Sequence, residues 1–197
     1  MLRKSKFLWI TIFVVFVFVF TNTASAHCDS IKGPVVKAAQ KVLETSNINY
    51  VFVWIKAEHE KEIKNLFDRV LRVRKAGGEA KDLADKYFFE TVVRLHRMGE
   101  GVGYTGLKSE EYKPEKGIEE ADRAIETKSL TNVLVALDKK HYLKVNDLFN
   151  DLQSKSSYSV NYINAGREYV ESYVHFIHYV EALYAGNTEQ TEEHHHN

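Results

Sequence analysis

The sequence predicts an all-α protein, a helical bundle built from two repeated helical-hairpin halves. Only two prolines occur in 197 residues, so long stretches of the chain are free to be helical. The chain also matches itself without a gap when residue 38 is aligned with residue 120, which indicates a duplicated supersecondary unit. The aligned segments are AAQKVLETSNINYVFVWIKAEHEKEIKNLFD (38–68) and EADRAIETKSLTNVLVALDKKHYLKVNDLFN (120–150).

The repeat also decides how YVFVWI (50–55) is interpreted. Alone, this short aromatic and β-branched run is also typical of a buried strand. Its counterpart NVLVALDKK (132–140) is an ordinary helical sequence. Apolar positions then continue at helical spacing through Ile63, Leu66 and Val70. We therefore expect a helix here.

Proline, glycine and serine positions set the expected helix ends. Pro34 suits a first helical turn, and Ser46 and Asn47 interrupt the first helix. Further breaks are expected at 77–78 and at 156–159. The expected helices are 34–46, 48–75, 79–98, 118–127, 130–154 and 163–185. The expected regions are a signal peptide (1–26), a bundle domain (27–185, with repeats at about 34–98 and 116–180) and a flexible polar tail (186–197).

The segment 1–26 has the pattern of an export signal. A basic start is followed by an uncharged apolar run from Phe7 to Phe20, and then by Ala24-Ser25-Ala26, a small-x-small cleavage pattern. An uncleaved membrane anchor is the alternative, but a spanning helix needs roughly 20 apolar residues, more than this run provides. We expect cleavage before His27 and a periplasmic or extracellular location.

Composition limits the partners of the mature chain. Removal of the signal leaves 197 − 26 = 171 residues, and without the three basic residues of the signal the formal charge is 24 − 27 = −3. Nothing in this charge indicates binding to nucleic acid or, after cleavage, to a membrane. The single cysteine excludes an internal disulfide. We expect a monomer or a homodimer. The sequence contains no hydrolase, NTPase or c-type haem motif.

The mature chain would begin with His27 and Cys28. An N-terminal histidine offers its amine and its imidazole to one metal ion, and Cys28 adds a thiolate. Sulfur beside nitrogen ligands suits copper, nickel or zinc better than calcium or magnesium. Two alternatives stay open: Cys28 is a thiol that binds no metal ion, or it forms a disulfide with another chain.

Histidines recur along the predicted helices at positions that can face one another. His59 and His96 lie at similar distances from the turn at 77–78, and His141 and His178 flank the turn at 156–159 in the same way. The last helix carries a row of acidic and imidazole side chains on one face: Glu171, His175, His178 and Glu181. The alternative is that these histidines are hydrogen-bonded core residues.

Three stretches are similar to an uncharacterised bacterial family of exported proteins, a domain of unknown function. They are HCDSIKGPVVKAA, LADKYFFETVVRLHRMGEGVGYTGLK and AGREYVESYVHFIHYVEALY. The N-terminus alone resembles that of nickel superoxide dismutase in His27, Cys28, Asp29 and Gly33. The second cysteine of that motif is Lys32 here, so the resemblance implies an N-terminal metal chelate more than it implies a dismutase.

These observations favour an exported protein that binds a transition metal ion, in metal handling or small-molecule redox chemistry. Copper or nickel is favoured, and zinc also suits the ligands. Alternatives are a structural or interaction module that binds no metal, a metalloenzyme like superoxide dismutase, and a b-type haem bundle. The candidate metal ligands are His27, Cys28, His96, His178, His141 and Glu171. No catalytic residue is assigned.

Overall fold

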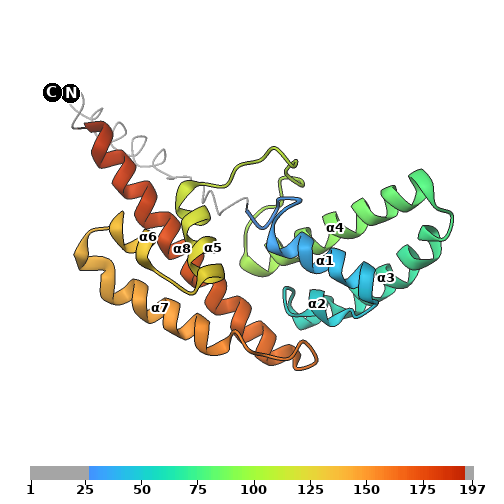
Figure 1. Ribbon diagram of the computed structural model, residues 1–197. Coiled ribbons are helices and arrows are strands. Elements are labelled where there is room, and N and C mark those ends of the chain that lie inside the picture. Colours follow the sequence, from blue (N-terminus) through green and yellow to red (C-terminus); the bar gives the residue numbers. More distant parts are fainter. Residues whose placement is uncertain (1–26, 194–197) are drawn as a thin grey trace, which may run out of the picture.

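The computed structural model describes residues 27–193, and this part of the chain is helical without a named strand (Figure 1). The prediction of an all-α fold is confirmed. The predicted signal peptide and residues 194–197 lie outside the described residues. The α-helices are α1 (Pro34–Thr45), α2 (Asn49–Phe52), α3 (Glu60–Arg74), α4 (Gly78–Glu100), α5 (Lys116–Thr127), α6 (Thr131–Val135), α7 (Tyr142–Lys155) and α8 (Ile163–Glu193), with short 3₁₀ helices η1 (Ala57–His59) and η2 (Lys139–His141).

The first half of the protein, residues 34–100, is organised around α4. Helices α1 and α3 pack against α4, and their apolar faces close a core in which Val35, Ile63 and Phe88 are fully buried. The rings of Phe67 and Phe88 lie 5.9 Å apart between α3 and α4. Helix α4 ends at Gly101, whose φ of 76° is the left-handed conformation in which glycine commonly ends helices.

The second half, residues 116–193, is organised around α8 in the same manner. Helices α5 and α7 pack against α8, and Ile118, Leu152 and Phe176 are fully buried between them. The rings of Phe149 and Phe176 lie 5.4 Å apart between α7 and α8. Each half therefore has a core of its own, and Figure 1 shows α1–α4 on one side of the molecule and α5–α8 on the other.

Several elements recur at the repeat offset, the shift that aligns residue 38 with residue 120. This offset carries both ends of α1 onto the ends of α5, and both ends of η1 onto the ends of η2. Each first helix ends in a left-handed residue, Ser46 (φ 59°) and Lys128 (φ 54°), and the same offset relates these two positions. The superposition of residues 34–98 on 116–180 stays a prediction, and a superposition in an experimental structure would test it.

Two of the predicted helices are interrupted, so the expectation of continuous helices over 48–75 and 130–154 was wrong. In the first half, Val51 to Ile55 are five consecutive buried or half-buried residues. Five consecutive helical positions point in all directions around the axis, so one helix cannot bury them all against one core. The chain turns instead, and Lys56 is extended with a ψ of 150°. In the second half, Asp138 is extended and its carboxylate accepts a hydrogen bond from the Lys140 N–H.

The other helices match their predictions except at their ends. Helix α8 extends further than expected, to Glu193, through much of the segment predicted as a polar tail. Within residues 27–193, no helix combines the length and the apolar character that crossing a membrane requires. Trp54 packs against the core clusters of both halves, so it lies at their junction.

Candidate functional site

The N-terminal segment, residues 27–33, is folded against the helices. The residues from His27 to Ser30 are all buried. The Ser30 N–H donates to the His27 carbonyl at 3.1 Å and the Gly33 N–H donates to the Ser30 carbonyl at 2.8 Å, so the segment forms consecutive turns. A side chain at Gly33 would collide with the His27 carbonyl oxygen, which explains glycine at this close approach.

The connection after α4 fixes this segment to the first half. The Lys108 N–H donates to the Asp29 carbonyl at 2.8 Å, and the Ile31 N–H donates to the Lys108 carbonyl at 3.1 Å. Arg97, buried on α4, has its Nε 3.5 Å from Asp29 Oδ1. Burial raises the pKa of Asp29, although the charge of Arg97 acts in the opposite direction. The segment is thus held by both backbone and side-chain contacts.

His27 and Cys28 lie where the two halves meet. Cys28 is buried in the core of the first half, and its thiol group lies beside the ring of His96 of α4. His27 contacts the second half, with its Nε2 2.8 Å from Asp122 Oδ2 on α5. Asp122 Oδ1 accepts a hydrogen bond of 2.9 Å from the Tyr173 hydroxyl on α8. Two adjacent residues therefore contact different halves of the protein.

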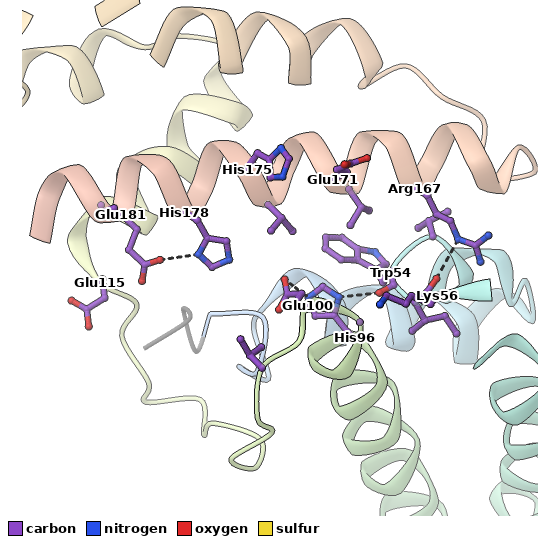
Figure 2. A pocket seen from close by; sticks show the side chains of 18 of the residues that line it. Trp54, Lys56, His96, Glu100, Glu115, Arg167, Glu171, His175, His178 and Glu181 are labelled. Carbon is purple, nitrogen blue, oxygen red and sulfur yellow. Dashed lines mark hydrogen bonds and ion pairs between the residues drawn. The ribbon is translucent and has the colours of Figure 1, made fainter. Parts of the chain in front are cut away.

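Both ring nitrogens of His96 have defined neighbours. Its Nδ1 lies 2.9 Å from the Trp54 carbonyl oxygen, and because a carbonyl only accepts, Nδ1 is the donor (Figure 2). Its Nε2 lies 3.3 Å from Glu100 Oε1. The His96 ring also packs edge-on against Trp54, with ring centroids 5.6 Å apart. Nε2 is therefore the nitrogen that can lose its proton and accept another cation.

The groups around Nε2 stabilise positive charge. Burial alone would lower the pKa of His96, but hydrogen bonds with Cys28 and Glu100 and the charges of both raise it to about 10. Burial alone would raise the pKa of Glu100, but its hydrogen bond with His96 and the charge of that imidazole lower it. The charges of Arg97 and His178 lower it further. At neutral pH the site thus holds a buried imidazolium beside a carboxylate.

A cavity of about 1280 Å³ separates the two halves next to His96. Helix α8 forms one wall, while residues 53–57 and the end of α4 form the other (Figure 2). Trp54 and several valines make much of the lining apolar. The polar lining includes three histidines and four glutamates: His96, His175, His178, Glu100, Glu115, Glu171 and Glu181.

The structure brings together three of the predicted ligands near the junction of the halves, namely His27, Cys28 and His96. They come from the N-terminal segment and from α4. Cys28 and His96 are in contact, whereas the imidazole of His27 is directed to Asp122.

The remaining predicted ligands lie elsewhere. His178 and Glu171 line the cavity from α8. His141 lies where η2 meets α7 and does not line the cavity. Among residues 27–193, no three or more His, Cys, Asp or Glu side chains lie together in an arrangement that could already hold a metal ion. The predicted ligand set is therefore only partly assembled.

Comparison with known proteins places the chain in a family. Residues 32–179 match the model of a family of unknown function (DUF6448). The chain belongs to this family. No curated protein and no solved structure matches it. The range that matches the DUF6448 model includes His96 and His178 but begins after His27 and Cys28.

Sequence reasoning missed three residues of the site in this DUF6448 member. Glu100 lies four residues after His96, a helical spacing that places both side chains on one face, and that signal was available. Trp54 had no such signal, because an aromatic residue in an apolar run is usually only a core residue. Asp122 had none either, because its contact with His27 depends on how the two halves are arranged.

Proposed function

We propose that this protein is exported and that it binds a transition metal ion through its mature N-terminus, His27 and Cys28, together with His96. Export is inferred from the signal-like residues 1–26. One thiolate with imidazole nitrogens suits copper or nickel, and zinc is also compatible with these ligands. The proposed activity is metal binding, in metal handling or redox chemistry.

The main support for this proposal is the hydrogen bonding of His96. Metal-binding histidines almost always donate their other ring N–H to a carbonyl or a carboxylate, which fixes the tautomer and the direction of the ring. His96 has this arrangement, with Nδ1 donating to the Trp54 carbonyl at 2.9 Å. Its Nε2 lies 3.3 Å from Glu100 Oε1, and Cys28 lies beside the same ring. Both side chains ligate metals when deprotonated.

His27 has a comparable arrangement. Its Nε2 is 2.8 Å from the carboxylate of Asp122, and Nδ1 is the ring nitrogen nearer to the backbone amine. An N-terminal histidine forms a small chelate ring through its α-amine and Nδ1. The Asp122 carboxylate would then orient the imidazole as carboxylates orient zinc-bound histidines.

The protonation of the site is consistent with exchange of a proton for a metal ion. His96 has a raised pKa of about 10 because its neighbours favour a cation at this position. A metal ion would replace the proton on Nε2 and bring in the Cys28 thiolate. The groups that would bind the metal ion interact with other groups of the protein. Metal binding must therefore replace these interactions.

Metal titration of the chain that starts at His27 tests the proposal. We expect one copper, nickel or zinc ion per chain, and a strong loss of affinity when one residue is added before His27. Cys28→Ser and His96→Gln should each weaken binding at least tenfold, since each removes a ligand. His141→Gln is the matched control, because His141 does not line the cavity. Circular dichroism verifies that each variant keeps its helices.

Equal binding of copper, nickel and zinc by the extended and the mature chain would contradict the N-terminal site. If Cys28→Ser and His96→Gln also bound as the mature chain does, the metal proposal as a whole would be wrong. The buried histidines would then have a structural role, as expected for an interaction module that binds no metal.

A further inference from the structure

A second histidine–carboxylate pair lies across the cavity from His96. His178 Nδ1 is 3.1 Å from Glu181 Oε2, three residues later on α8. Both side chains line the cavity, and Figure 2 shows them projecting from α8 toward the wall that carries His96 and Glu100. The side chain of His178 is 34% exposed, so the ring is accessible from the cavity.

The His178 ring is oriented as a potential ligand. Its Nδ1 is paired with a carboxylate, which leaves Nε2 as the nitrogen for a cation, as in other carboxylate–histidine–metal arrangements. Across the cavity, His96 and Glu100 line the opposite wall. The two histidine–carboxylate pairs therefore line one cavity from different halves.

The two walls of the cavity belong to separately packed halves, which are in contact where Arg167 of α8 donates hydrogen bonds to the Ile55 carbonyl and to Glu60. Each half has its own core, and the cores meet at Trp54. Trp54 packs edge-on against Tyr173 of α8, with ring centroids 5.7 Å apart. Helices α4 and α5 are joined by residues 101–115, which contain no helix. Two separately packed units with a shared contact are the usual basis of hinge closure around a ligand.

We propose that His178 is the ligand that the second half contributes to the metal site, with Glu181 orienting its ring. A bound transition metal ion then joins His178 to Cys28 and His96 and draws the two walls of the cavity together. This inference rests on the proposed function. It also accounts for the partly assembled ligand set, because ligands on opposite walls come within reach of one ion only when the cavity closes.

His175 provides a matched control on the same helix. It lines the same cavity and is exposed, but Figure 2 shows its ring pointing away from His96. A metal ion held between the walls therefore involves His178 and not His175. Glu181→Gln tests the positioning role separately, because it keeps the His178 imidazole and removes the charge of its partner.

Tryptophan fluorescence can measure closure and binding together. The chain has two tryptophans, and because Trp9 lies in the predicted signal peptide, the mature chain keeps only Trp54, which lines the cavity. Zinc is the probe, since it has no redox chemistry. We expect zinc to shift Trp54 emission to shorter wavelength as water leaves the closing cavity. His178→Gln should lose this shift and bind zinc at least tenfold more weakly, and Glu181→Gln should bind it with intermediate affinity.

The outcomes separate this inference from the proposed function. If His178→Gln binds zinc with the affinity of the mature chain and shows the same emission shift, His178 is not a ligand, while the N-terminal site stands. If His175→Gln is as impaired as His178→Gln, the assignment to one face of α8 is wrong. If the mature chain itself does not bind zinc, copper or nickel, the proposed function fails and this inference fails with it.

Discussion

His96 is the central residue of the proposed metal site. It is almost completely buried, yet its pKa is raised to about 10 because hydrogen bonds with Cys28 and Glu100 outweigh the effect of burial. A buried imidazolium is stable only beside acceptors of this kind. The same acceptors can ligate a metal ion, so one cluster explains both the retained proton and the proposed site.

The raised pKa of His96 predicts how pH affects the stability of the metal-free protein. A histidine has a pKa of about 6.5 when unfolded, and the folded value is about 10. The folded state therefore binds more protons between these values, and stability falls as pH rises through this window. The contribution of His96 is complete below pH ~6.5 and lost near pH ~10. Urea unfolding at intervals across this range measures it.

His96→Gln is the control for this prediction. The difference in unfolding free energy between the wild-type chain and the variant isolates the contribution of His96 from other groups that ordinarily titrate in this range. It should shrink as the pH rises. A difference that is constant across the window would show that His96 is not protonated in the folded protein.

Helix ends could be predicted from the sequence better than helix continuity. Glycine pairs, serine clusters and Pro34 marked most boundaries correctly. The breaks before η1 and η2 were missed, because apolar spacing continues through them and only the three-dimensional core limits how many consecutive residues one helix can bury. Trp54 packs against both cores, and no local sequence pattern shows this.

The left-handed ends of α1 and α5 predict an effect on stability. Ser46 and Lys128 have positive φ, which costs residues with a side chain roughly 1–2 kcal/mol. Glycine removes this cost, but it also increases the conformational entropy of the unfolded chain, which offsets part of the gain. Ser46→Gly and Lys128→Gly should therefore each stabilise the protein by about 0.5–1 kcal/mol. Thermal and urea unfolding measure this change.

Lys64→Gly is the matched control, since Lys64 is exposed inside α3 and adopts helical geometry. That change should destabilise the protein by about 1 kcal/mol. If all three glycine variants are destabilised alike, the two helices do not end in left-handed residues, and the recurrence of this feature at the repeat offset is wrong.

In the whole molecule, the N-terminal segment links two separately packed halves. In the second half, His27 contacts Asp122, whose carboxylate also accepts a hydrogen bond from the Tyr173 hydroxyl. In the first half, Cys28 lies beside His96. The sequence predicted that His27 and Cys28 share a metal ion with histidines of the bundle such as His96. It did not predict contacts to the second half, because those depend on the packing of the halves against each other.

The positions of the histidines also separate what the repeat predicts from what the packing of the halves decides. His96 and His178 occupy matching positions of the repeat, and both line the cavity between the halves. His141 has an equally good position in the repeat, but it lies at the start of α7, away from the cavity. Repeat position therefore predicts where a residue lies within its half, and only the arrangement of the halves decides which residues meet.

X-ray absorption spectroscopy of the metal-loaded mature chain is the sharpest test of the proposed metal site, because it identifies the atoms bound to the metal. With zinc, we expect one sulfur at about 2.3 Å, from Cys28, and imidazole nitrogens at about 2.0–2.1 Å. Cys28→Ser should remove the sulfur and leave the nitrogens. A spectrum with only nitrogen and oxygen ligands in the mature chain would contradict a metal site built on His27, Cys28 and His96.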